Sequence, residues 1–235
     1  MAEGRSAPCA IAIMAKAPRH GEVKTRLVPP LTAAEATALS AAFIRDTAEN
    51  ILAAAGIAAI DGFVAYSPPG SAAAFAGIVP EPIRLLPPRR IGLGASLLDA
   101  ASDLLAAGYS AACLLDADSP TLPSSVLVEA ARALALPGDR VVLGRAADGG
   151  YYLIGLKNPH RRLFEDIAWS TDSVFRQTLE RAAEIGLPVH ALPVWYDVDD
   201  VASLRRLIGD LAAPDRTGYP APHTSALLQR LAPRL

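Results

Sequence analysis

The chain has 235 residues, of which 51% are hydrophobic and 20% charged, and its formal net charge is −2. This length and apolar content suit one large α/β domain with a sizeable core and exclude a disordered chain. The small negative charge argues against nucleic acid as the main partner, although local clusters of Lys and Arg can still bind small phosphates.

The first apolar run bears on the redox state and the compartment. Cys9 and Cys113 sit in separate apolar runs without a C-x-x-C pair, which predicts buried free thiols. Residues 9–15 are too short to span a membrane and are followed at once by Lys16. No clear signal-peptide pattern is present, so a soluble cytoplasmic protein is expected.

Hydrophobic periodicity in the first half of the chain predicts alternating strands and helices. A capping box formed by Thr32 and Glu35 predicts the start of a helix that Gly56 ends. A second helix is expected to carry Leu97 and Leu104 on one face and to end at Gly108. The predicted strands of this half are residues 9–15, 62–66, 83–86 and 111–115.

The second half continues the alternation. Ser124 or Ser125 is expected to cap a helix that runs to about Leu136. The other predicted elements are strands 141–144, 151–156 and 189–195, a helix over 172–185, and a short helix beginning near residue 201. The tail after Gly209 is rich in Pro, Ala and polar residues, and it is expected to lie on the surface or wrap loosely. We expect one domain over residues 1–208 and a C-terminal extension over 209–235.

Strands that alternate with helices predict a mostly parallel sheet covered on both faces. The hairpin-like spacing around Asp148 indicates that not every strand is parallel. In such sheets ligands bind beyond the carboxyl ends of the strands. Polar clusters at 16–26, 116–118 and 197–199 all follow predicted strands, which makes one shared site plausible.

Two carboxylates follow the strand over 111–115. Asp116 and Asp118 are spaced by one residue, and in an extended segment such residues point to the same side. They could face one hard cation, which prefers oxygen ligands and could in turn hold a diphosphate. The competing interpretation is a turn, because Asp-Ser-Pro is good turn chemistry.

The loop after the first strand is basic. Lys16, Arg19, Lys24 and Arg26 fall within eleven residues, and Gly21 lets the backbone come close to a ligand. Lys and Arg can hold phosphate oxygens by charge-assisted hydrogen bonds, although a solvated loop would look the same. The loop is not a Walker A motif, because no G-x-x-x-x-G-K-[ST] occurs.

Three further blocks could contact a ligand. Gly92-Leu93-Gly94 is interpreted as a helix N-terminus near a phosphate, or as simple turn glycines. Asp148-Gly149-Gly150-Tyr151-Tyr152 suits a sugar but is equally a β-turn. Trp169-Ser170-Thr171 offers an aromatic ring beside hydroxyls, or a helix cap.

These blocks in this order resemble the bacterial GT-A-type glycosyltransferase family associated with arsenosugar biosynthesis, long known as a domain of unknown function. The matching blocks, which span about residues 9–208, are Lys16-x-Pro18-x-x-Gly21-x-Val23-Lys24-Thr25-Arg26-Leu27, Phe43-x-x-Asp46-Thr47, Gly92-x-Gly94, Asp118-Ser119-Pro120-x-Leu122-Pro123, 148–156, Trp169-Ser170-Thr171 and Asp197-Val198-Asp199. The sequence departs from the pattern at Arg89-Arg90-Ile91, where relatives tend to have Gln and Gly.

The resemblance implies a nucleotide-diphosphosugar transferase fold with Mg²⁺ or Mn²⁺ held by acidic residues. Asp118 is the safest metal ligand, Asp116 is less safe, and Asp197 or Asp199 would add a carboxylate from the far side. The phosphate-binding residues would be Lys16, Lys24 and Arg26. The sugar or the acceptor would meet Asp148, Tyr151 and Trp169, and Asp148 is the candidate base.

The preferred hypothesis is glycosyl transfer from a nucleotide-diphosphosugar to a small acceptor. The cation and Lys24 and Arg26 would neutralise the leaving nucleoside diphosphate. The basic loop also resembles 2-phospholactate guanylyltransferases, in which an NTP is attacked at the α-phosphorus and pyrophosphate leaves. The third hypothesis is a non-catalytic nucleotide-binding protein on the same scaffold. A homo-oligomer stays open.

Overall fold

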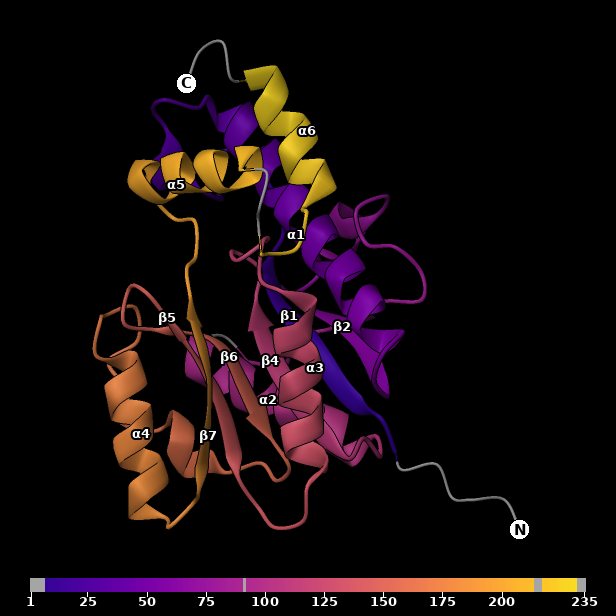
Figure 1. Ribbon diagram of the computed structural model, residues 1–235, viewed down its shortest axis with the longest axis vertical. Coiled ribbons are helices and arrows are strands. Elements are labelled where there is room, and N and C mark those ends of the chain that lie inside the picture. The colour runs from indigo at the N-terminus through magenta and orange to yellow at the C-terminus, as the bar shows by residue number, and fades with distance from the viewer. Residues whose placement is uncertain (1–6, 91, 214–216, 232–235) are drawn as a thin grey trace.

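A single seven-stranded sheet organises the chain, whose computed structural model describes residues 7–90, 92–213 and 217–231. The strand order is β3-β2-β1-β4-β6-β5-β7 (Figure 1). β6 is antiparallel to both β4 and β5, and the other neighbouring pairs are parallel. The strands are β1 (Cys9–Lys16), β2 (Ile60–Ser67), β3 (Arg84–Leu86), β4 (Ala111–Asp116), β5 (Val141–Ala146), β6 (Tyr151–Leu156) and β7 (Val189–Trp195). The predicted α/β sheet with an antiparallel exception is confirmed.

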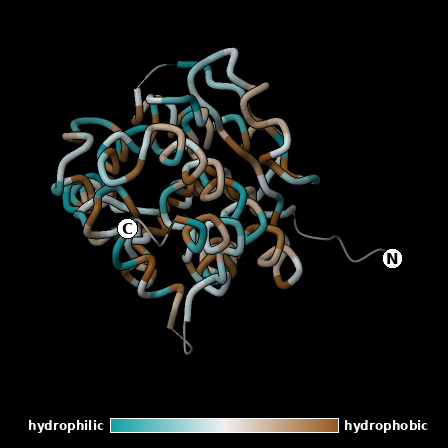
Figure 2. The backbone as a smooth tube through the Cα atoms, turned by 90° about the horizontal axis from the view of Figure 1, so that it is seen from above, coloured by the Kyte–Doolittle hydropathy of each residue, from teal (hydrophilic) through white to brown (hydrophobic). Residues whose placement is uncertain are grey.

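Helices cover both faces of this sheet. One face packs against α1 (Ala33–Ala55) and α3 (Ser124–Ala135), and the other against α2 (Leu93–Ala106) and α4 (Val174–Glu184). Hydrophobic stretches recur throughout the centre of the molecule when it is seen from above (Figure 2). The central strand β1 is buried on both faces because its side chains alternate between the two cores.

Local sequence signals account for several element boundaries. The amide of Glu35 donates to Thr32 Oγ1 at 3.2 Å and the amide of Thr32 donates to the Glu35 carboxylate at 2.8 Å, so the predicted capping box is confirmed. Cys9 and Cys113 are buried free thiols, as expected. Among the described helices, none combines the length and hydropathy needed to cross a bilayer.

The serine cap predicted for α3 is wrong. The N-cap position is Pro123, and no side chain caps the helix. The Ser124 hydroxyl instead donates to Asn50 Oδ1 at 2.5 Å, and the Asn50 amide donates to Leu122 O at 2.7 Å. Ser124 is therefore used to tie α3 to α1, a contact that local sequence cannot reveal.

The loose tail predicted after Gly209 is also wrong. α5 (Val201–Ala212) continues through position 209, and α6 (Pro222–Leu231) packs against α1 at the top of the molecule (Figure 1). Leu228 and Leu231 are buried in a third hydrophobic cluster. That cluster lies beyond the sheet and also holds Leu27, Leu31, Leu39, Phe43, Tyr196, Val198, Leu204 and Leu207. The end of the chain thus supports the loop after β1 and the segment after β7.

Candidate functional site

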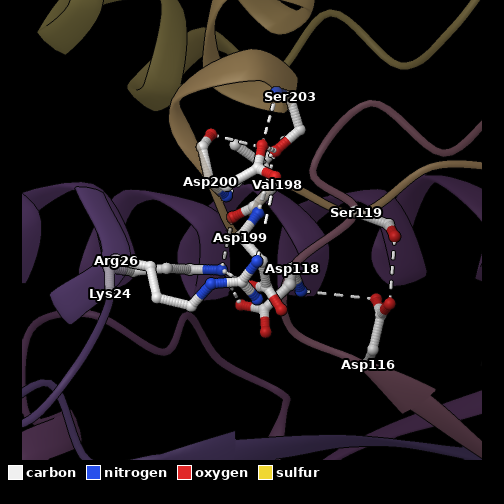
Figure 3. A network of polar contacts seen from close by, with 9 residues as sticks. All are labelled: Lys24, Arg26, Asp116, Asp118, Ser119, Val198, Asp199, Asp200 and Ser203. Carbon is white, nitrogen blue, oxygen red and sulfur yellow. Dashed lines mark hydrogen bonds and ion pairs between the residues drawn. The ribbon is translucent and has the colours of Figure 1, made fainter. Parts of the chain in front are cut away.

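Lys24 lies at the centre of the polar groups beyond the carboxyl ends of the strands. Its ammonium is 2.6 Å from Asp118 Oδ1 and 2.9 Å from Asp199 Oδ1, and it donates to Val198 O at 2.7 Å (Figure 3). We call Lys24, Asp118 and Asp199 the lysine cluster. Burial alone would lower the pKa of Lys24, but the two carboxylates outweigh it and raise that pKa. The ammonium is therefore held in its charged form.

Local folding brings this cluster together. Lys24 has a left-handed φ of 49° at the start of the short 3₁₀ helix η1 (Thr25–Leu27), whose Leu27 is fully buried. The Phe43 ring of α1 lies 5.2 Å from the ammonium. The amide of Val198 donates to Asp118 O at 2.9 Å and joins the end of β7 to the end of β4. Asp199 is consequently held beside Asp118, with Lys24 between them.

The two aspartates after β4 serve different partners. Asp116 accepts hydrogen bonds from the Asp118 amide at 3.3 Å and the Ser119 hydroxyl at 3.0 Å, as the turn interpretation expects. β4 ends at Asp116, and Figure 3 shows Asp118 turned toward Lys24 and Asp116 turned toward Ser119. Burial and the charges of Asp118 and Asp197 raise the pKa of Asp116 well above its ordinary value.

Two more carboxylates, those of Asp148 and Asp197, lie close to this region. Burial, followed by the charges of Asp148, Asp199 and Asp118, raises the pKa of Asp197 to about 6. A buried carboxylate whose pKa is raised by neighbouring carboxylates lies close to them without enough positive charge to balance the group. Such an unbalanced group is the arrangement in which a divalent cation would be stabilised.

The loop that carries Asp148 is shaped by a glycine. Gly149 has a φ of +98°, and an added Cβ would lie 2.2 Å from the backbone oxygen of Asp172. The amide of Phe175 donates to Gly149 O at 3.0 Å, and the amide of Gly150 donates to Asp148 Oδ1 at 2.8 Å. The tight approach of this loop to the start of α4 holds Asp148 in the lining of a cavity beside Asp197.

Three adjoining cavities run along this edge of the sheet. The first, of about 490 Å³, is bounded by the ends of β1, β2 and β3 and by the start of α2. The second, of about 290 Å³, shares Met14, Lys16 and Glu22 with the first and includes the lysine cluster. The third, of about 360 Å³, shares Arg26 and Asp199 with the second and includes Asp148 and Asp197. Their shared residues make them one continuous row.

The cations of the basic loop differ in their surroundings. Lys16 is exposed, and its ammonium donates to Glu22 O at 2.7 Å. Arg26 is 69% exposed and lies 3.8 Å from Asp200 Oδ2. Gly21 has a φ of +73° in an exposed part of the loop and lines none of the three cavities. Lys16 and Arg26 are thus free to turn toward a ligand, whereas the Lys24 ammonium is already paired with Asp118 and Asp199.

The aromatic residues expected to meet a sugar pack against each other and against the start of α2. Tyr151 and Trp169 make an edge contact with centroids 6.4 Å apart, and a Cβ on Gly94 would lie 2.7 Å from Trp169 Nε1. None of these three residues lines the cavity row. The structure therefore packs Gly94, Trp169 and Tyr151 together, beside Leu93 at the start of α2, which does line the 490 Å³ cavity.

Some residues of the cavity row were not anticipated. Arg90 donates to both oxygens of Asp99, at 2.7 and 2.5 Å. Its hydrogen bonds and charge, helped by Arg89, lower the pKa of the Asp99 carboxyl. Arg89 lies 3.3 Å from Asp99 and 3.2 Å from Asp103. All four line the 490 Å³ cavity, and Ile91 lies outside the described residues. The only sequence signal was the departure from the family pattern at these arginines.

A second cluster, formed by Asp46, Glu49 and His223, was also missed. Their ligand atoms all lie within 4.8 Å of one another, so the group is compact enough to hold a metal ion. In the described part of the chain, the aspartates Asp116, Asp118, Asp197 and Asp199 form no group that compact. We call Asp46, Glu49 and His223 the α6 anchor, because His223 belongs to the first turn of α6.

Residues 50–171 match the model of a family described as "Uncharacterized protein conserved in bacteria (DUF2064)". The chain belongs to this family. No curated protein matches it. This membership confirms the resemblance to a bacterial family that was inferred from the sequence blocks.

Solved structures show the fold of this DUF2064 member. A protein from Desulfovibrio desulfuricans G20, provisionally named a nucleotide-diphospho-sugar transferase, is 26% identical, with 96% of each chain covered and a TM-score of 0.81. A Leptospira borgpetersenii cytidylyltransferase is 12% identical, with 97% of this chain and 94% of that chain covered and a TM-score of 0.53. A Methanothermobacter nucleotidyl transferase is 18% identical, with 86% and 95% covered and a TM-score of 0.52. The chain thus has a nucleotide-diphosphosugar transferase-like fold.

Proposed function

We propose that this DUF2064 member is a metal-dependent glycosyltransferase that moves a sugar from a nucleotide-diphosphosugar to a small neutral acceptor. The three cavities in the row suit, in order, the nucleoside, the diphosphate and the acceptor. Apolar side chains such as Met14, Leu86 and Leu93 line the 490 Å³ cavity together with Tyr66, and such a surface suits a nucleoside. The neighbouring cavity holds Lys16, Lys24 and Arg26, which suit phosphate oxygens.

Two carboxylates that line the 290 Å³ cavity, those of Asp118 and Asp199, fit a hard divalent cation. Asp118 and Asp199 already share a positive charge, the Lys24 ammonium, and their oxygen donors are those that Mg²⁺ and Mn²⁺ prefer. Asp118 would be one ligand, and Asp197 or Asp199 would supply another. The bound ion would neutralise charge that develops on the leaving nucleoside diphosphate. Lys24 and Arg26 would share that task.

The acceptor would enter the third cavity. Asp148 lines this cavity and could take the proton of an acceptor hydroxyl as the new glycosidic bond forms and the nucleoside diphosphate leaves. The charge on Asp197 is close enough to Asp148 to be linked to it electrostatically.

The acidity of this third cavity is the observation that carries the proposal. Four carboxylates, those of Asp148, Asp197, Asp199 and Asp200, line it with two guanidinium groups, those of Arg26 and Arg206. Arg206 is also stacked on the Tyr196 ring at 3.8 Å and lies 3.7 Å from Asp210. Because the charge of the divalent ion would be balanced by the substrate diphosphate, an anionic acceptor would still meet net repulsion there, so a neutral hydroxyl compound is favoured.

Nucleotidyl transfer is the second candidate, because a cytidylyltransferase and a nucleotidyl transfer enzyme share the fold. In that reaction an NTP would occupy the same two cavities, and pyrophosphate would leave. A phosphate-bearing acceptor would then have to approach Asp148 and Asp197. This electrostatic cost is the reason we prefer glycosyl transfer.

One assay separates the two reactions. The protein is incubated with Mn²⁺ or Mg²⁺, with panels of nucleotide sugars and NTPs, and with neutral or phosphorylated acceptors. Release of a nucleoside diphosphate together with a glycosylated neutral acceptor would support the proposal. Pyrophosphate release from an NTP without sugar-nucleotide turnover would refute it. Tight nucleotide binding that needs no metal and leads to no turnover would indicate a binding protein instead.

A further inference from the structure

The Lys24 ammonium is surrounded by oxygen atoms, as a bound metal ion would be. An ammonium has three donors, and here three oxygens lie around it: Asp118 Oδ1 at 2.6 Å, Asp199 Oδ1 at 2.9 Å and Val198 O at 2.7 Å. Its side chain is only 5% exposed, and the Phe43 ring lies 5.2 Å away. Every hydrogen-bonding capacity of the group is therefore in use before any substrate arrives.

This arrangement conflicts with a direct role in phosphate binding. Lys24 cannot donate to a diphosphate while all three donors are engaged by Asp118, Asp199 and Val198. A divalent cation likewise cannot approach Asp118 and Asp199 closely while an ammonium lies between them, because the two positive charges repel. The cavity of about 290 Å³ that Lys24 lines gives its flexible side chain a place to move.

We propose that Lys24 is an exchangeable cation of this site. It neutralises Asp118 and Asp199 while no metal is bound, and it is displaced toward the substrate diphosphate when the divalent ion arrives. The identity of the ion and of the diphosphate rests on the proposed function. The exchange couples the binding of the two ligands. The metal binds weakly until a diphosphate is present to accept hydrogen bonds from the Lys24 ammonium. The diphosphate binds weakly until the metal has displaced that ammonium from Asp118 and Asp199.

Removal of the Lys24 ammonium tests whether it competes with the divalent ion for Asp118 and Asp199. Lys24→Met keeps the length of the side chain and leaves Asp118 and Asp199 without their cation. We expect this variant to bind Mn²⁺ at least about tenfold more tightly than the wild type in the absence of nucleotide, as measured by electron paramagnetic resonance. Lys16→Met is the matched control, because Lys16 is in the same loop but donates only to a backbone oxygen. Affinity of Lys24→Met no higher than that of Lys16→Met would overturn the proposal.

The coupling is tested with pyrophosphate. In the wild type, the preformed Mn²⁺–pyrophosphate complex is expected to bind much more tightly than Mn²⁺ alone. In Lys24→Met that ratio of dissociation constants should fall, because no ammonium remains to be transferred. An unchanged ratio would show that Lys24 stays with its carboxylates, as a permanent structural ion pair would.

Unfolding temperatures keep the test decisive if Lys24→Met is unstable. Two uncompensated carboxylates would lower its stability without metal, and Mn²⁺ should raise its unfolding temperature more steeply than that of the wild type or of Lys16→Met. Equal slopes would contradict the exchange. Failure of the proposed function is seen separately: tighter Mn²⁺ binding by Lys24→Met without turnover of any nucleotide sugar by the wild type would retain the exchange and reject glycosyl transfer. Turnover of a nucleotide sugar by the wild type, with unchanged Mn²⁺ affinity of Lys24→Met, would retain glycosyl transfer and reject the exchange.

Discussion

The lysine cluster and the α6 anchor are two acidic groups that differ in how completely their charges are satisfied. The carboxylate of Asp46 in the anchor is fully buried, and it accepts the backbone amides of His223 at 3.0 Å and Thr224 at 2.7 Å. Glu49 lies 2.9 Å from His223 Nε2 and 3.2 Å from Arg45 Nε. In the anchor each carboxylate thus has dedicated donors, most of them from one helix start.

The lysine cluster has the opposite balance. One ammonium faces Asp118 and Asp199, and burial followed by the charges of neighbouring carboxylates raises the pKa values of the nearby Asp116 and Asp197. Burial also raises the pKa of Asp46 in the anchor, but there the neighbouring hydrogen-bond donors oppose the shift. The two groups therefore differ in opposite senses, because the anchor is the more compact and the lysine cluster has the smaller share of positive charge. A group left short of positive charge, at the edge of a cavity, has a stronger reason to recruit a cation than one that already caps a helix.

The largest expected effect comes from Asp118→Asn, which removes one charge from the lysine cluster. We expect a loss of about 10²–10³ in turnover together with a loss of Mn²⁺ binding, because Asp118 would hold the ion that stabilises the leaving group. Steady-state assays and Mn²⁺ titration measure both. Glu49→Gln in the α6 anchor is the control and should leave both near wild type. The reverse outcome would assign the metal to the anchor.

Asp46→Ala should be the most destabilising change in the α6 anchor. It leaves the amides of His223 and Thr224 without their acceptor, at a cost of about 2 kcal/mol in the free energy of unfolding. Urea unfolding measures the loss, and limited proteolysis should show earlier cleavage before α6. Glu49→Gln keeps the Asp46 bonds, and an equal loss in that control would mean that Asp46 is not the principal anchor.

Most of the architecture could be predicted from the sequence, because it depends on local signals. Periodicity placed all seven strands, and Thr32 with Glu35 marked the start of α1. The docking of α6 could not be predicted, since it depends on Asp46 of α1 meeting backbone amides 177 and 178 residues later. Local composition in the tail suggested only a surface segment.

The candidate site was predicted in part for the same reason. The carboxyl ends of parallel strands meet at one edge, so the positions of Lys24, Asp118 and Asp199 followed from topology. Their direct ion pairs did not follow, because side-chain direction beyond a strand end depends on the turn. The packing of Trp169 on Gly94 was likewise hidden, since it joins segments from different parts of the fold.

Arg26→Ala should have a smaller effect, confined to the phosphate side of the lysine cluster. Arg26 is exposed and has one distant partner, so its loss should weaken pyrophosphate binding by about tenfold without weakening nucleoside binding. Titration calorimetry with both ligands measures the difference. Arg19→Ala, in the same loop but outside the cavity row, should change neither affinity. Equal losses of both ligands in Arg26→Ala would remove the phosphate role.

The smallest expected effect is a pH-dependent gain in stability from Asp197→Asn. Asp197 has a pKa of about 6 in the folded protein and about 3.9 in an unfolded chain, so the native state binds its proton more tightly. Wild-type stability should therefore fall as the pH rises through this range. With metal removed by chelation, Asp197→Asn should be more stable than the wild type by about 1 kcal/mol at pH 8, after allowance for solvent screening, and not at pH 4.

Denaturation curves at both pH values measure that difference. A gain of the same size at pH 4 would attribute it to packing, and no gain at pH 8 would show that the carboxylates around Asp197 are already balanced.

The ion pair between Lys24 and Asp199 joins residues 175 positions apart. During synthesis on a ribosome, the lysine would emerge first and remain without its second carboxylate until the residues between them had been translated. The hydrophobic cluster behind it is completed later still, by Leu228 and Leu231. A nascent chain could therefore build much of the sheet while its ligand-binding edge was still unformed, so assembly of that edge is a closing step of folding.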